Sequence, residues 1–186
     1  MARAFVAVDE ATGQLAIRKP RDGEQLFRGT PRYCSLNTHY RKEQGRVDDL
    51  WSWLYMLVEL HKGLPWRSIR KEEDVRVEKE KCPVEDLLRT CPEEFRKIHE
   101  YLTTLKYEDR PDYYGLYSEC WAGLKRVRGS FLDRYEWETE IDEEDTAISI
   151  AEDDRRTHRP VGRTKLAQKM YPFASTAAFK ANILNL

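Results

Sequence analysis

The segment 48-DDLWSWLYMLVEL-60 decides the fold that the sequence predicts. Its apolar side chains recur on every side of a helix, which is typical of a helix at the centre of a domain rather than on its surface. Asp48 and Asp49 stand at its start, where carboxylates accept hydrogen bonds from free amides and favour the helix dipole. Gly63 and Pro65 follow and end it. We therefore expect a mainly α fold built around one buried helix.

Further helices are expected after this segment. Residues 71–81 read as a charged, exposed helix, and Pro92 with two following glutamates starts another. Pro111 opens the clearest amphipathic pattern, with apolar residues three and four apart. The stripe of this last helix consists of Tyr113, Leu116, Tyr117, Cys120, Trp121 and Leu124. At the other end, residues 1–26 read as a long exposed loop with a short strand around Phe5–Val8.

The composition is that of one ordinary domain with a tail. The chain has 186 residues, of which 40% are apolar and 35% charged, and its net charge is −1. This balance argues against a nucleic-acid binder, and the longest apolar run is too short to span a membrane. The 4 cysteines have no C-x-x-C spacing and the 4 histidines are scattered, so no metal site is predicted. We expect a cytoplasmic protein with reduced thiols, a nuclear location also being open.

Charge is unevenly distributed near the C-terminus. Residues 139–154 contain eight acids and no bases, whereas residues 155–169 contain six Lys or Arg and no acids. Such blocks are typical of a solvated tail. The predicted division is therefore a loop region at 1–44, a helical domain at 45–138 and a charged, flexible tail at 139–186.

A basic and aromatic loop precedes the central helix, 27-FRGTPRYCSLNTHYRKEQGRVDDLWSW-53. Its order F-R-G-T-x-R-Y-x-S-x-N-x-H-x-x-x-E-x-G-R-x-D-D-L-W-S resembles the end of the activation segment in the casein kinase 1 superfamily, most closely its tau-tubulin kinase branch. The resemblance continues through YMLVEL, GLPW, CPEEF, LKYEDRPDY and DRYEWE and covers roughly residues 1–138. It implies the helical C-lobe of a Ser/Thr protein kinase, without the N-lobe.

The resemblance also concerns what the sequence lacks. Met1-Ala2-Arg3 matches the Leu-Ala-Arg that follows the Asp-Phe-Gly motif of this family, so the chain is expected to start just after that motif. No G-x-G-x-x-G and no H-R-D occurs in the sequence. The parent reaction is implied to use ATP and Mg to phosphorylate protein Ser or Thr. We expect this chain alone to bind neither cofactor, to hold no catalytic residue and no metal, and to be inactive.

The resemblance assigns roles to residues of the loop and of the helix start. Thr30 is expected to contact the floor of the peptide groove, and a turn threonine is the alternative. Arg32 is expected to bind an anion, such as a substrate phosphate or acidic side chain, because a guanidinium donates two parallel hydrogen bonds. A solvated arginine is the alternative. The substrate-binding set is Thr30, Arg32 and Arg28. The set with structural roles is Gly29, Tyr33, Ser35, Asn37 and Asp49.

Two details of this set depend on the family comparison. Asp49 matches the kinase Asp that accepts amide hydrogen bonds from the catalytic loop, with an ordinary helix cap as the alternative. Casein kinase 1 proper has a second basic residue at the anion site, where this chain has Val77, and either Arg76 or Lys79 is a candidate to replace it. Nothing in the sequence lowers the pKa of Cys34, which is not assigned as reactive.

Three interpretations follow. The favoured one is part of a casein kinase 1-like or tau-tubulin kinase-like kinase domain. The second is a non-catalytic, pseudokinase-like module that binds proteins through the loop and the tail, and the third is an unrelated helical scaffold. In the first two the partner is a protein substrate or protein partner, with neither nucleic acid nor membrane. Self-association through the exposed surface that would face the N-lobe is also expected, because exposed apolar patches drive association.

Overall fold

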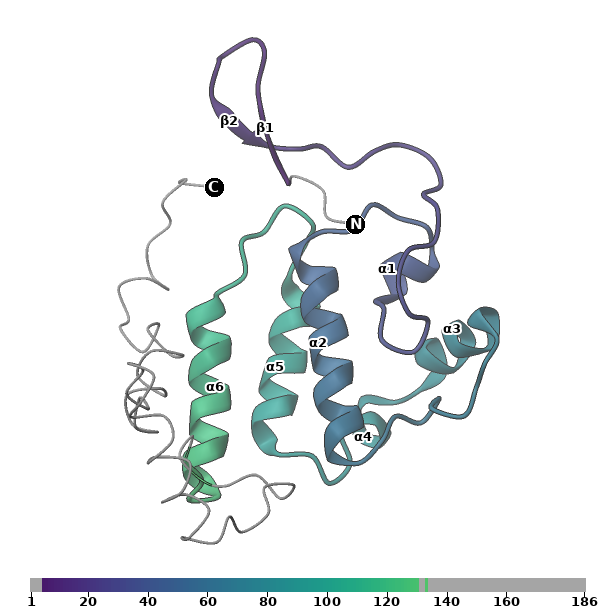
Figure 1. Cartoon of the computed structure of the whole chain (residues 1–186), viewed down its shortest axis with the longest axis vertical. Helices are drawn as coiled ribbons and strands as arrows, with labels where there is room; N and C mark the ends of the chain where they lie inside the picture. Colours follow the sequence, from purple (N-terminus) through teal and green to yellow (C-terminus); the bar gives the residue numbers. More distant parts are fainter. Residues whose placement is uncertain (1–4, 131–132, 134–186) are drawn as a thin grey trace, which may run out of the picture. The chain divides into compact units, whose positions relative to one another are not determined.

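The computed structural model describes residues 5–130 and 133. Within them the elements are, in chain order, β1 (Val6–Val8), β2 (Leu15–Ile17), α1 (Leu36–His39), α2 (Arg46–His61), α3 (Glu72–Lys81), α4 (Val84–Leu87), α5 (Glu93–Thr104) and α6 (Tyr113–Arg126). The mainly α prediction is confirmed (Figure 1). The predicted tail at 139–186 lies outside the described residues. None of the described helices is long and apolar enough to cross a membrane.

The core and the candidate site lie in one compact unit, described here for residues 5–123. In the second unit, the described residues after Gly123 complete α6 and close its end, where Arg128 N–H donates to Lys125 O and Gly129 N–H to Leu124 O, both at 2.9 Å.

The strand predicted around Phe5–Val8 forms one arm of an antiparallel hairpin. β1 pairs with β2 in the register Val6↔Ile17 and Val8↔Leu15. The connecting turn is held by Asp9, whose carboxylate accepts from Ala11 N–H at 2.8 Å. The strand β2 was not predicted, because three residues are too few to display an alternating pattern.

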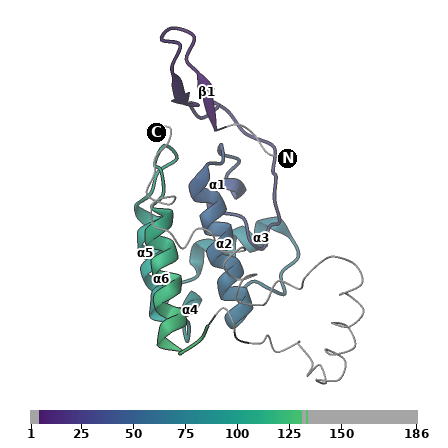
Figure 2. The same cartoon turned by 60° about the vertical axis from the view of Figure 1, so that its left-hand side comes forward.

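Helix α2 is the central helix, as predicted. In both views it lies between α5 on one side and α3 on the other, and Figure 1 shows α1 on the side of α3 (Figures 1 and 2). Its most deeply buried side chains are those of Leu54 and Val58, each 0% exposed. The core around them comes from every described helix after α1 and from the α2–α3 loop: Tyr55, Leu64, Trp66, Val75, Leu87, Leu88, Ile98, Leu102 and Leu116. Trp66 is thus a core residue, as expected.

The expectation that α2 is buried on every side is wrong. Met56 is 42% exposed and Leu60 is 76% exposed, so apolar side chains in this helix also occupy an accessible face. The predicted end of the helix is confirmed. Gly63 has φ +86°, and its N–H donates to Val58 O and Glu59 O at 3.2 and 3.0 Å, which closes the last turn.

Candidate functional site

The loop before α2 begins with a tight turn. The N–H groups of Tyr33 and Cys34 both donate to the carbonyl of Thr30 at 3.0 Å. Gly29, immediately before the turn, has φ +141°, a conformation that favours glycine. The ring of Tyr33 packs half-buried against the core. The turn therefore presents Arg28 and Thr30, both exposed, at the surface of the domain.

Asp48 holds this loop on the start of α2. One carboxylate oxygen accepts from Ser35 Oγ at 2.6 Å and Asn37 Nδ2 at 3.2 Å, and the other accepts from Gly45 N–H at 2.7 Å. Asp48 is only 4% exposed. Because it is the third residue of the helix, the last of these bonds is half of a capping box. A single buried carboxylate thus joins helix, loop and α1.

The cap considered for Asp49 belongs to Asp48 instead. Asp49 is exposed and lines a surface pocket. Its carboxylate accepts no hydrogen bond from any residue that the structure describes. Partial burial and the neighbouring charge of Asp48 raise its pKa.

Lys79 of α3 is a second anchor of the loop. Its ammonium donates to Pro31 O at 2.8 Å and Cys34 O at 2.6 Å and lies 3.3 Å from His39 Nε2. Lys79 is 7% exposed, and burial lowers its pKa to about 8. The amine is therefore charged at neutral pH, with all three N–H groups engaged. The suggestion that Lys79 replaces a missing anion-binding base is wrong, because its ammonium is bonded inside the protein.

The geometry of Lys79 fixes the proton position on His39. Since the ammonium has no acceptor capacity, Nε2 of His39 must accept, and the ring proton is on Nδ1, 3.5 Å from Glu72 Oε1. Burial and the charge of Lys79 lower the pKa of His39. The thiol of Cys34 lies 3.4 Å from the same Nε2, and burial raises its pKa. Cys34 is therefore a protonated core thiol, in line with its not being assigned as reactive.

This cluster predicts a pH dependence of stability. The unfolded chain protonates His39 near its ordinary pKa of about 6.5, whereas the folded state resists protonation. Stability should thus be unaffected by His39 above that pKa and should fall as the pH drops below it. We expect the free energy of unfolding by urea to decline between pH 7 and 5.5. Glu72 does not contribute in this window, because the bond from Arg41 lowers its pKa below the ordinary 4.5.

The matched variant for this pH dependence is His39→Gln, whose side-chain oxygen still accepts from Lys79 but does not titrate. Its stability profile should be flatter than that of the parent. His99→Gln serves as a second variant, since burial also lowers the pKa of His99. A His39→Gln profile that runs parallel to the parent would contradict the assignment.

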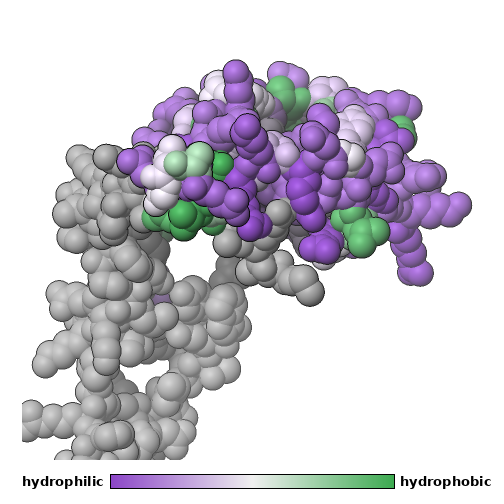
Figure 3. Space-filling model, turned by 90° about the horizontal axis from the view of Figure 1, so that it is seen from above, coloured by the Kyte–Doolittle hydropathy of each residue, from purple (hydrophilic) through white to green (hydrophobic). Residues whose placement is uncertain are grey.

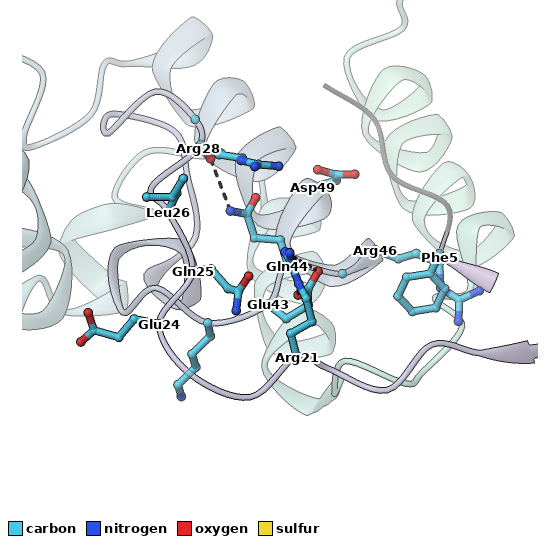
Figure 4. Close-up of a pocket in the computed structure, with 13 residues that line it drawn as sticks. Phe5, Arg21, Glu24, Gln25, Leu26, Arg28, Glu43, Gln44, Arg46 and Asp49 are labelled. Atoms are coloured by element: carbon cyan, nitrogen blue, oxygen red, sulfur yellow. Dashed lines mark hydrogen bonds and ion pairs between the residues drawn. The ribbon is translucent and has the colours of Figure 1, made fainter. Parts of the chain in front are cut away.

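A cavity of about 720 Å³ lies beside the loop (Figure 4). Four cations and three carboxylates are among its lining residues, namely Arg21, Arg28, Lys42, Arg46, Glu24, Glu43 and Asp49. Arg21 is paired with Glu43 at 2.5 Å, and the Arg46 guanidinium lies 4.4 Å from the ring centre of Phe5. The guanidinium of Arg28 has no partner among the described residues, and the Lys42 ammonium faces only the Tyr40 ring, at 5.6 Å. The cavity therefore presents two cations, Arg28 and Lys42, beside the carboxylates of Glu24 and Asp49.

The predicted substrate-binding residues do not all lie at one site. Arg28 lines the cavity, together with Gly29 and Asp49. Arg32 points elsewhere, with its guanidinium 3.3 Å from Glu59 Oε1 and 2.7 Å from the carbonyl of Arg67. The Arg32 side chain remains 41% exposed. Substrate binding by Arg32 and Thr30 stays a prediction.

The comparisons with known proteins agree with these features. No family model matches the chain. It is 36% identical over 144 residues to a probable serine/threonine-protein kinase of Dictyostelium discoideum, an alignment covering 75% of this chain and 27% of that protein. It is 32% identical over 142 residues to an inactive tau-tubulin kinase of Caenorhabditis elegans, covering 75% and 49%. This chain is related to the Ser/Thr protein kinases.

A third relative supports the branch within these kinases. Over 128 residues the chain is 32% identical to casein kinase I homolog 3 of Schizosaccharomyces pombe, covering 65% of this chain and 29% of the relative. The resemblance to the casein kinase 1 superfamily is confirmed, and so is the mainly α, C-lobe-like fold of a kinase. The chain spans between 27% and 49% of the length of these relatives.

The sequence places Asp48 at the start of the helix but does not show that its carboxylate also holds the loop, nor that Lys79 is buried. The capping role of Asp48 agrees with its position three residues after Gly45. Lys79 follows the buried Val75 by four residues, which places both on one face of α3, but this spacing alone does not distinguish a buried lysine from an exposed one. Among the described residues no three His, Cys, Asp or Glu side chains gather as a metal site would require.

Proposed function

We propose that this chain provides the peptide-binding, helical part of a kinase domain of the casein kinase 1 or tau-tubulin kinase type, whose parent reaction is ATP-dependent phosphorylation of protein Ser or Thr. The observation that carries the proposal is the loop of residues 27–45. Asp48 and Lys79 hold it on α2 and α3, and Arg28 and Lys42 open into the adjoining cavity. A rigid loop with two free cations suits recognition of a peptide with acidic side chains.

The role of these residues is to bind and orient a peptide. In the parent reaction ATP supplies the phosphoryl group, while Mg and a lysine neutralise its charge. We assign no step through ATP or Mg to this chain and propose that, taken alone, it is inactive, because its sequence has no G-x-G-x-x-G and no H-R-D motif. A cytoplasmic location and a protein partner are part of the same proposal.

The test combines two measurements on the 186-residue chain. Calorimetry should detect no Mg-dependent binding of ATP, and casein and tubulin should receive no labelled phosphate. Fluorescence anisotropy should instead detect binding of Ser- or Thr-containing peptides flanked by glutamates. Loss of a partly exposed charge pair costs about 0.2–1 kcal/mol, so Arg28→Ala and Lys42→Ala should each weaken binding by roughly 1.5- to 5-fold. Arg96→Ala, on α5, is the control. Micromolar, Mg-dependent ATP binding would contradict the proposal, as would peptide binding unaffected by both loop variants.

A non-catalytic binding module is the second candidate. One observation favours it: Asp48 and Lys79 hold the loop through hydrogen bonds within this chain. The loop conformation therefore has anchors that do not depend on the ATP-binding part of a kinase. Mapping the 5′ end of the transcript separates the two candidates. Upstream coding sequence ending in Asp-Phe-Gly supports the kinase domain, and a transcript that starts translation at Met1 supports the module.

Self-association is expected through the surface that would face the N-lobe, and we propose that accessible apolar side chains further along α2 also contribute. Met56 and Leu60 are 42% and 76% exposed, and burying such surface on a second copy is favourable by about 25 cal/mol per Å². The face seen from the hairpin side is by contrast mostly hydrophilic, with separate apolar spots (Figure 3). Light scattering of fresh protein should detect oligomers that the double change Met56→Lys, Leu60→Lys reduces.

Val8→Lys, in the hairpin, is the control for this change, since Val8 is 60% exposed but lies outside α2. A monodisperse monomer with a cooperative thermal transition at about 45–65 °C would overturn the expectation.

A further inference from the structure

A second cavity lies at the C-terminal end of α2. Helix α4 lies at the same end of α2 (Figures 1 and 2). Its volume is about 600 Å³. The walls come from three stretches of chain: the α2–α3 connection from Lys62 to Arg67, the end of α3, and the segment from Cys82 to Thr90. None of these residues belongs to the loop or the cavity described above.

The charges around this cavity are mostly positive. Its lining includes the cations Lys62, Arg67, Lys81 and Arg89 and the acids Glu78 and Asp86. Arg89 is paired with Asp86 at 2.6 Å, and the Lys62 ammonium donates to the carbonyl of Asp86 at 2.8 Å.

Arg67 and Lys81 are the cations of this cavity whose side chains have no partner among the described residues. Neither side chain has a hydrogen bond or ion pair with any described residue, and one carboxylate, Glu78, opposes them. The free groups therefore carry an excess of positive charge.

The remaining walls are apolar or conformationally fixed. Leu64, Pro65 and Pro83 contribute apolar surface. Thr90 has φ +67°, which is unusual for a β-branched residue, and its carbonyl is hydrogen-bonded to the ring of His61 at 2.9 Å. Backbone held in such a conformation is frequent at ligand sites. A cavity with charged and apolar walls fits a peptide better than a bare ion, which needs only charge.

We propose that this cavity binds an acidic peptide segment of a partner protein, through carboxylates that reach Arg67 and Lys81. The two cations come from different stretches of the chain, which suits separate, singly charged groups. A phosphate concentrates about two negative charges at one point and is disfavoured here by the carboxylate of Glu78. The proposal does not depend on kinase activity, because it concerns a surface apart from the loop and from Arg28.

The cavity is connected to the loop through one segment. Arg67, whose side chain lines the cavity, accepts a hydrogen bond on its carbonyl from Arg32 Nη2 at 2.7 Å, and Trp66 Nε1 donates to Arg32 O at 2.8 Å. A peptide held at Arg67 therefore lies against the same chain segment that fixes Arg32. This places the site where a partner can remain bound while the loop engages a second peptide segment.

The test uses the full chain and a fluorescein-labelled peptide in which glutamates alternate with serine and leucine. Anisotropy should show binding that weakens between 50 and 300 mM salt. Arg67→Ala and Lys81→Ala should each reduce the affinity about 2- to 5-fold, and the double variant about 10-fold. Glu78→Gln should tighten binding, because it removes the opposing charge. Lys106→Ala, beyond the end of α5, is the control and should have no effect.

A second readout locates the peptide directly. A carbodiimide, which joins amines to carboxylates without a spacer, should link the peptide to Lys81 or Lys62, as read by mass spectrometry. Links to Lys42 alone would overturn the proposal by placing the peptide in the loop cavity. So would an unchanged affinity in the double variant, tighter binding of a phosphoserine peptide through the same residues, or equal binding of an RNA oligomer. Affinity that falls in Arg28→Ala but not in the double variant would also overturn the proposal, so its failure is distinguishable from failure of the peptide-binding loop.

Discussion

Replacing Lys79 by Met is expected to lower the free energy of unfolding by about 2–4 kcal/mol. The change leaves the buried carbonyl of Cys34 without its donor, at about 1–3 kcal/mol, and removes the strongest donor to the part-buried carbonyl of Pro31, which keeps only the Cys34 thiol at 3.6 Å. Relief from burying a charge offsets part of this cost, since burial already lowers the pKa of Lys79 to about 8. Urea unfolding measures the difference, and limited proteolysis should show earlier cleavage of the loop at 27–35.

The matched control is Lys81→Met, the same chemical change on the same helix. Lys81 is exposed, so its replacement should change stability by less than about 0.5 kcal/mol. If Lys79→Met is as stable as Lys81→Met, the two carbonyls find other donors and Lys79 is not an anchor of the loop.

The helices could be predicted because their signals are local. Pro92 before two glutamates, and Gly63 after an apolar run, mark helix ends by the backbone chemistry of single residues. Periodicity also identified the apolar stripe of α6, in which Leu116 is 5% exposed and Tyr113 is 37% exposed. A local pattern does not predict that Met56 and Leu60 are exposed. Apolar residues lie on every side of α2, so its sequence does not distinguish the side that is covered by other helices from the side that is accessible.

The arrangement of the site could not be predicted in the same way. Arg28 and Arg32 are four residues apart, yet one faces a cavity and the other is bonded to Glu59 and to the Arg67 carbonyl. The separation follows from the tight turn at Thr30 and from contacts with residues 27 and 35 positions further along the chain. Long-range contacts of this kind leave no periodic signal. The family resemblance indicated which loop carries the site, but not which of its charges are free.

Asp48→Asn is expected to destabilise the fold by about 2–4 kcal/mol. The carboxylate is 4% exposed and accepts from Ser35, Asn37 and the N–H of Gly45. An amide of the same shape has one acceptor oxygen and must turn its NH₂ group toward one of these donors. The capping of α2 and the attachment of α1 should weaken together. Circular dichroism during urea unfolding gives the magnitude, and hydrogen exchange of the α1 amides should accelerate.

Asp49→Asn makes the identical change one residue later and should behave differently. Asp49 accepts no hydrogen bond from the described residues, and its raised pKa means that the folded state already disfavours its charge. Removing that charge should therefore be neutral or stabilise slightly, by no more than about 0.5 kcal/mol. A larger loss at Asp49 than at Asp48 would contradict the capping geometry. It would support the structural role that the kinase resemblance assigns to Asp49, and would imply that Asp49 has a partner beyond the described residues.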